Sequence, residues 1–262
     1  MPRTKILLAL VAVAIVLALV LLPRGRGPVD DATVAEAITF YGYTEEGTPL
    51  WEIHAESGRI DGAEQRLHGV SVDFYDEEGG ALRVRGVELH RTAGVSRLSG
   101  GVRIERGDDL LLETEAVSWD EARDRLEAGA IDLTTPELRV TAARFEYELE
   151  TAAASFVGGV DASAELDTRW TIEADRAEER DGVVTFRGGV AAESEDGESF
   201  RCERLEVESK SETVRLTGSV IGDWASGHLS ADSVRFDNDG LYAAGDVTAR
   251  LDLGESRDSD GT

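Results

Sequence analysis

The chain has a single cysteine, only two lysines and five prolines in 262 residues. One cysteine cannot form an internal disulfide or build a cysteine-based zinc site, so both are excluded. Positive charge is scarce as well, because 27 lysines and arginines face 53 aspartates and glutamates, for a net charge of −26. This acidity excludes sequence-independent binding to nucleic acid phosphates. Hydrophobic residues still make up 41% of the chain, which is enough for a folded core.

The few positive charges are unevenly placed. Residues 1–26 contain four basic residues and no acid, so every acidic residue lies in the remainder of the chain. An acidic, lysine-poor surface suits a protein that works in high salt, where electrostatic screening is strong. It equally suits an acidic protein from a GC-rich genome, and neither alternative specifies a function.

An unbroken apolar run occupies residues 6–22, where every residue is Ile, Leu, Val or Ala. As a helix this run would be about 25 Å long, which is at the lower limit for crossing a bilayer. A cleaved signal peptide is the alternative, but Pro23 and Arg24 follow the run where a small-residue cleavage site is needed. We therefore expect an uncleaved single-pass anchor, with residues 1–5 as a cytoplasmic stub and residues 23–37 as a linker.

A pattern of apolar residues at alternate positions recurs about every 30 residues along the rest of the chain. Between copies lies a glycine followed at once, or one residue later, by valine or isoleucine, as in Gly101-Val102 and Gly189-Val190. A repeat of this length indicates structural units that stack on one another. The seven copies begin at Trp51, Leu82, Leu110, Leu138, Trp170, Phe200 and Leu229.

Alternation with a period of two predicts β-strands with one buried face, and there is little helical periodicity after residue 22. Beyond Pro49 the only proline is Pro136, which fits long hydrogen-bonded ladders. We predict an all-β, elongated fold of two facing antiparallel sheets, with one strand from each repeat in each sheet. Seven repeats at about 4.8 Å per strand would give a stack of about 34 Å, with an apolar trough between the sheets.

Motifs in the first half of this region resemble the LptC family. In order, after an apolar run and a short linker, they are Phe40-Tyr41-Gly42-Tyr43, Trp51-x-Ile53-x-Ala55, Val70-x-Val72-x-Phe74-Tyr75 and Leu98-Ser99-Gly100-Gly101-Val102-x-Ile104. The resemblance implies an OstA-like β-jellyroll over residues 38–166. Residues 167–253 resemble additional LptA-like repeats, either continuous with the first part or a separate module. We expect residues 254–262 to be a disordered acidic tail.

The LptC family provides the bitopic inner-membrane component of the lipopolysaccharide export bridge. The resemblance therefore implies an inner-membrane anchor, a periplasmic bulk and a trough for the acyl chains of lipopolysaccharide or a related glycolipid. It implies that an LptBFG-like ABC transporter supplies this lipid and that an LptA-like bridge protein receives it. The alternative is a membrane-anchored β-solenoid that acts as a scaffold or adhesion spacer at the cell surface. A carrier must open a lipid-sized cavity, whereas a scaffold should be filled with side chains.

The inward positions of the repeats are the candidates for the lipid groove: Trp51, Ile53, Val84, Leu110, Leu112, Leu138, Val140, Trp170, Ile172 and Phe200. For the two tryptophans, core packing is the alternative to contact with a bound acyl chain. The open ends of such a stack present unpaired backbone groups, which favours docking by strand addition. The candidates at these edges are Ile38, Phe40, Val247, Ala249, Leu251 and Leu253.

Catalytic and metal-binding patterns are not evident in the sequence. His54 and His228 fall on the outward phase of their strands, and Cys202 falls on the inward phase, where a small buried hydrophobic residue is expected. The segment 237–240, Asp-Asn-Asp-Gly, reads as a hairpin turn, with a weak calcium site as the alternative. We expect a protein that is not an enzyme and has no cofactor or metal.

Overall fold

The computed structural model describes residues 33–251, apart from gaps at 44–46, 62–63, 76–80, 93, 108–109, 121, 137, 149–150, 152, 166–167, 209–210, 212 and 238. The expected stub, the anchor at 6–22, most of the linker, Leu253 and the acidic tail lie outside this part. Within it, no helix is long and apolar enough to span a bilayer. The described chain forms the following strands: β1 (Thr33–Tyr43), β2 (Pro49–Asp61), β3 (Glu64–Tyr75), β4 (Ala81–Thr92), β5 (Val95–Arg106), β6 (Leu110–Asp120), β7 (Arg125–Ala128), β8 (Ile131–Thr134), β9 (Leu138–Ala142), β10 (Arg144–Glu148), β11 (Ala153–Glu165), β12 (Arg169–Arg180), β13 (Val183–Ser194), β14 (Ser199–Glu208), β15 (Thr213–Trp224), β16 (Gly227–Asp237), β17 (Gly240–Ala244) and β18 (Thr248–Leu251).

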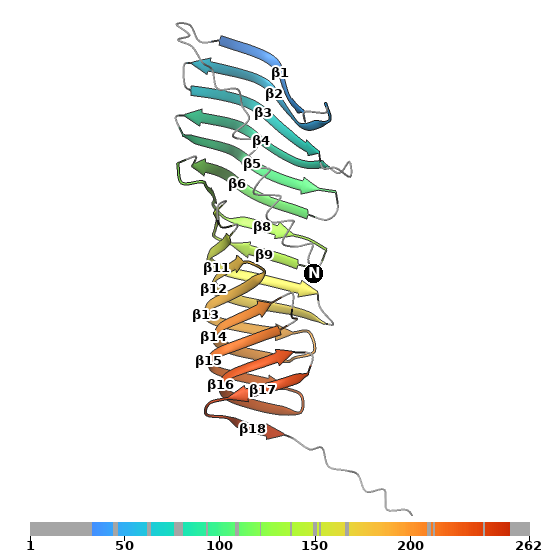
Figure 1. Cartoon of the computed structure of the whole chain (residues 1–262), viewed down its shortest axis with the longest axis vertical. Coiled ribbons are helices and arrows are strands. Elements are labelled where there is room, and N and C mark those ends of the chain that lie inside the picture. The colour runs from blue at the N-terminus through green and yellow to red at the C-terminus, as the bar shows by residue number, and fades with distance from the viewer. Residues whose placement is uncertain are drawn as a thin grey trace, which may run out of the picture.

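The strands stack along one axis in the order of the sequence, from β1 at one end to β17 and β18 at the other (Figure 1). Neighbours pair antiparallel throughout, as β2 does with β3 and β12 with β13. Three pairs of short strands (β7 with β8, β9 with β10, β17 with β18) each lie side by side with one long strand. Each such pair therefore takes the place of one long strand. We call each level of the stack, whether one long strand or one such pair, a rung.

Most long strands bend near their middle, so one strand serves both layers of the fold. In β13 the pairing register shifts between Arg187 and Val190, and Gly188 and Gly189 there have φ values of 84° and 57°. Glycine is favoured at such positive φ values because it has no Cβ. The segment before this bend belongs to what we call the second layer, and the segment after it belongs to the first layer.

This arrangement corrects the predicted count of strands. Each repeat is a hairpin of two rungs, and each rung contributes to both layers, whereas the sequence predicted one strand per layer. The described chain therefore has fifteen rungs, which at about 4.8 Å each give a ladder of about 72 Å, not about 34 Å. Alternation alone could not reveal this, because a bent strand has the same period of two on either side of its bend.

The apolar core lies between the two layers. In β5 the buried residues are Ser96 and Leu98 before the bend and Val102 and Ile104 after it. Register aligns such positions between rungs, so that Leu98 pairs with Leu89 on one side and Val117 on the other. Burial of apolar area in these columns contributes about 25 cal/mol per Å² to folding.

The first strand starts earlier than predicted. β1 begins at Thr33, so residues 33–37, which the sequence assigned to the linker, pair with β2. Val34 is 70% exposed, which explains why no apolar alternation marked this segment. Farther along, β11 and β12 pair from Ala154↔Glu179 to Glu165↔Arg169. The ladder is therefore continuous across residues 166 and 167.

Candidate functional site

Inward-facing side chains of neighbouring rungs lie in continuous columns. One column of the second layer runs through Phe145, Phe156, Ala177, Phe186 and Leu205, each paired with the next in the register. These positions follow from the alternation of each strand and from the uniform register of the ladder. The column presents an unbroken apolar wall to the opposite layer.

Between the two layers lies an apolar cavity of about 620 Å³, formed by rungs from β8 to β17. Side chains of both layers line it, Leu138 and Ile172 from the first layer and Leu205 and Leu216 from the second. We call this cavity with its lining the trough. Six aromatic residues are part of the lining: Phe156, Trp170, Phe186, Phe200, Trp224 and Phe236.

An aromatic cluster connects the two layers inside the trough. The rings of Trp170 and Phe200 stack with centroids 6.0 Å apart, both in the first layer. Phe200 also meets Phe236 of the second layer edge-on, at a centroid distance of 5.4 Å. Geometries of this kind are the preferred ones for aromatic pairs. Since all three side chains are only partly buried, each keeps a surface on which an apolar ligand could pack.

Half of the residues predicted for the lipid groove lie in the trough: Leu138, Val140, Trp170, Ile172 and Phe200. Four others, Trp51, Ile53, Val84 and Leu112, are buried in the hydrophobic core of the first half of the ladder. Leu110 is the first residue of β6. The structure thus divides the predicted set between two places along the stack, and contact with lipid stays a prediction for every member.

Sequence reasoning missed the second wall of the trough. Val184, Phe186, Leu205, Val207 and Phe236 face the predicted residues from the second layer. Their signal was present, because several repeats continue with a second alternating apolar pair, such as Leu205 and Val207. The predicted groove lacks this pair because alternation alone does not show that the two halves of each strand form opposite walls.

The predicted edge residues that fall in the described part of the chain lie at the two ends of the ladder. Ile38 and Phe40 belong to β1, which pairs with β2, and both are packed against the hydrophobic core. At the other end, Ala249 and Leu251 belong to β18, whereas Val247 precedes this strand and is 47% exposed. Docking at these residues is untested and stays a prediction.

Three carboxylates are the charged groups of the trough lining: Glu165, Glu179 and Glu198. Glu179 faces inward near the end of β12, and its Oε1 accepts a hydrogen bond of 3.2 Å from the backbone N–H of Gly182. Burial and the charge of Glu179 together raise the pKa of Tyr147 above the ordinary tyrosine value. Lysine, arginine and histidine are absent from the described lining.

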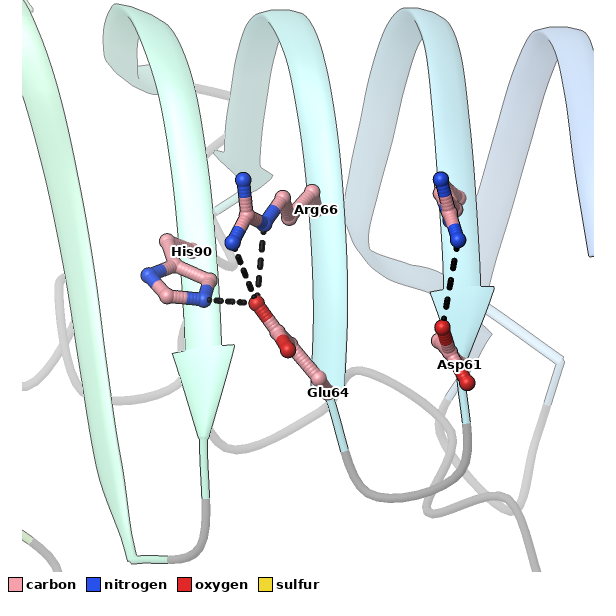
Figure 2. A network of polar contacts seen from close by, with 5 residues as sticks. Asp61, Glu64, Arg66 and His90 are labelled. Atoms are coloured by element: carbon pink, nitrogen blue, oxygen red, sulfur yellow. Dashed lines mark hydrogen bonds and ion pairs between the residues drawn. The ribbon is translucent and has the colours of Figure 1, made fainter. Parts of the chain in front are cut away.

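On the outside of the ladder, charged side chains pair with one another. Figure 2 shows Glu64 accepting hydrogen bonds from Arg66 Nε at 2.8 Å and Nη2 at 2.6 Å, while His90 Nε2 lies 2.7 Å from the same carboxylate. Arg66, and to a lesser degree His90, hold the pKa of Glu64 below its usual value. Beside them, Arg59 binds Asp61 at 3.2 Å. Exposed pairs of this kind contribute little to stability individually.

Groups capable of covalent chemistry are few among the described residues. Cys202 is buried on the inward face of β14, and this burial raises the pKa of its thiol to about 11. His54 is exposed on the outer face, with Nε2 at 2.9 Å from Glu52. The described ranges contain no group of three His, Cys, Asp or Glu side chains placed to hold a metal ion.

Comparison with solved structures gives a likeness of fold at low sequence identity. The fold matches the crystal structure of LptH, the LptA homologous periplasmic component of the lipopolysaccharide transport device from Pseudomonas aeruginosa, with a TM-score of 0.38 and 9% identity. The match covers 43% of this chain and 84% of that chain. No family model and no curated protein matches the sequence. Similarity at this level determines neither the family nor the function of the chain.

Proposed function

We propose that the protein is a membrane-anchored periplasmic lipid carrier of an export bridge. In this proposal residues 6–22 anchor it in the inner membrane, and the trough accepts the acyl chains of an exported lipid. An ABC transporter supplies the lipid, and the next β-jellyroll receives it. The single observation that supports this function is the apolar cavity of about 620 Å³ between the two layers.

The dimensions of the trough suit acyl chains. Nine rungs, from that of β8 to that of β17, line it, which at about 4.8 Å per rung makes it about 43 Å long. One leaflet of a bilayer core is about 15 Å deep, so the trough exceeds the length of one extended acyl chain. Burial contributes about 0.8 kcal/mol per CH₂ group, which makes an apolar trough a strong acceptor without any covalent step.

Release requires an acceptor of similar affinity, and the ends of the ladder offer a place for one. β1 pairs with β2, and among the described strands it has no partner on its other edge. β17 and β18 likewise pair with β16 alone. Strand addition at both edges would continue the trough from one module into the next. In this arrangement β1 meets the transporter and β18 meets the receiving protein, whose family the sequence resemblance identifies as LptA-like.

The scaffold alternative is disfavoured by the same cavity. A spacer has no need of space between its layers, and filling that space with larger side chains would increase its stability. The trough instead keeps partly exposed aromatic rings facing the space, as at Trp170 and Trp224. Apolar surface of this kind is costly unless it serves a ligand or a partner.

Site-specific photocrosslinking in cells tests the proposal. A photoreactive residue replacing Trp170 or Phe200 faces the trough, so we expect it to form adducts with lipid. The matched control replaces Thr171, which is exposed on the opposite face of the same strand, and should give no adduct. Absence of lipid adducts from both trough positions, in a protein that reaches normal levels, would contradict the carrier function.

A further inference from the structure

The charge of the trough specifies the class of lipid beyond its acyl chains, and this inference rests on the proposed carrier function. Glu165 and Glu198 lie at the rim formed by the turns that precede β12 and β14, and Glu179 lies near the opposite rim at the end of β12. The two rims are the two sides of the mouth, because the strands bend at the bottom of the trough and turn at its edges. A head group at the mouth therefore meets carboxylates from both sides.

The arginines at the two rims, Arg169 and Arg180, are already engaged by carboxylates, and the partner of Arg169 is Glu165 itself. Arg169 donates to Glu165 from Nε at 2.6 Å and also from Nη2, and its Nη1 lies 3.5 Å from Glu195. On the opposite rim, Arg180 lies 3.4 Å from Glu178. A phosphate at this mouth would compete with these carboxylates for each guanidinium. The arginines thus neutralise protein charge and offer no preformed anion site.

The turns around the mouth carry further negative charge. Glu195 and Asp196 are exposed in the turn before β14, Asp181 in the turn before β13 and Asp239 in the turn before β17. A phosphorylated head group would enter a field of like charge at both rims, and its repulsion is strongest where the apolar trough lowers the local dielectric. Hydroxyl groups behave differently, because a carboxylate is an acceptor and forms strong hydrogen bonds with them.

We propose that the trough selects acyl lipids whose head group is uncharged and carries hydroxyl groups, and that it disfavours phosphorylated head groups. Glu179 and Glu198 are the residues that make this selection, because Arg169 already neutralises Glu165. A neutral glycolipid meets both requirements, since its acyl chains enter the trough while its sugar hydroxyls donate to the carboxylates at the mouth.

Quenching of tryptophan fluorescence by brominated acyl chains tests the selection, because Trp170 and Trp224 line the trough. The full-length protein is titrated at 0.15 M salt with monoglucosyl diacylglycerol or with phosphatidylglycerol, both carrying the same brominated chains. We expect the glucosyl lipid to reach half-maximal quenching at a concentration at least about tenfold lower, since repulsion acts on the phosphate alone.

Two double variants of equal charge assign the effect to the trough. Changing Glu179 and Glu198 to Gln leaves Arg169 paired with Glu165, and it should reduce the difference between the lipids to about threefold or less, by improving phosphatidylglycerol binding. The control changes two exposed carboxylates outside the trough, as Glu173→Gln with Glu193→Gln, and should keep the tenfold difference. Circular dichroism verifies that both variants keep the β-sheet fold.

The outcomes separate this inference from the carrier function. If neither lipid quenches the trough tryptophans, the carrier function itself is wrong. If phosphatidylglycerol quenches as well as the glucosyl lipid or better, the selection for an uncharged head group is wrong while the carrier function stands. If the outer double variant shifts the preference as much as the trough variant, net charge and not the trough carboxylates makes the selection, and the assignment to these residues is overturned.

Discussion

At the scale of single residues, the protein separates apolar and charged groups across each strand. Inward positions form the core and the trough, while the arginines and carboxylates of the outer face pair with each other, as Arg139 does with Asp132 at 2.6 Å. Because the chain has about twice as many acids as bases, many carboxylates are left over, and those at the trough mouth acquire a specific role. Each outer pair contributes little to stability, and this contribution changes with pH.

Acid should weaken the fold in part through Glu64. Arg66 and His90 lower the pKa of this carboxyl in the folded state, so its contribution is present above the unfolded value of about 4.3 and is lost as the pH falls below it. We expect Glu64→Gln to lose less stability than the wild type between pH 7 and pH 3. Urea unfolding at both pH values measures this.

The matched control for Glu64 is Glu115→Gln, at an exposed position on the outer face of β6. This variant should lose as much stability between pH 7 and pH 3 as the wild type does. An identical acid response of Glu64→Gln and the wild type would show that the Glu64 network makes no pH-dependent contribution.

At the scale of elements, the bend in each strand determines how the fold is built. It turns one ladder into two facing layers, and it places a glycine of one strand beneath a side chain of the preceding strand. Gly188 lies under Asp175 in this way, and Gly218 lies under Glu203. A side chain at such a position meets both an unfavourable backbone conformation and a neighbour.

Alanine at Gly188 should destabilise the fold more than alanine at a bend glycine with free space around it. A Cβ at Gly188 would lie 2.7 Å from Cβ of Asp175, whereas a Cβ at Gly159 meets nothing within 4 Å. Both positions have positive φ values, 84° and 80°, and a left-handed conformation costs alanine about 1–2 kcal/mol. We expect Gly188→Ala to lose about 1–3 kcal/mol more than Gly159→Ala in the free energy of unfolding, because of overpacking.

Urea denaturation of the two alanine variants decides this. Equal losses would mean that Asp175 moves aside at no cost in free energy. Backbone conformation alone would then account for the destabilisation by alanine at both positions. A larger loss for Gly159→Ala would contradict the proposed close contact between the strands.

At the scale of the whole molecule, stability depends on stacking, since each rung contacts only its neighbours. Interior rungs are covered on both sides, as β12 is by β11 and β13. The rung of β17 and β18 is covered on one side among the described strands, and its residues Leu241 and Tyr242 are each 46% exposed. Stacked repeats of this kind behave as a one-dimensional array with weak ends.

Hydrogen exchange should follow this order along the ladder. We expect the amides of β17 and β18 to exchange at least about tenfold faster than those of β12 and β13, because opening a terminal rung breaks one interface instead of two. Mass spectrometry of peptides from each rung measures the rates. Equal protection of the last rung and the central rungs would show that the ladder opens only as one unit.

The class of the fold and many of the trough positions follow from the pattern of amino acids alone. A period of two along the strands and a period of about 30 along the chain were enough to predict stacked antiparallel strands and the inward positions, including Trp170 and Phe200. Both signals are local, because the side a residue faces depends on the alternation of its own strand. The residues that line the trough and those that fill the core have the same pattern, so the sequence could not separate them.

Which apolar positions face open space depends on how the two layers pack against each other. Trp51 and Trp170 occupy equivalent places in their repeats, yet Trp51 is 8% exposed in the core and Trp170 lines the trough. The difference depends on the distance between two layers formed by residues far apart in the chain, which no local pattern encodes. The same long-range placement brings Glu165, Glu179 and Glu198 to one mouth, although the sequence shows them only as three of 53 acids.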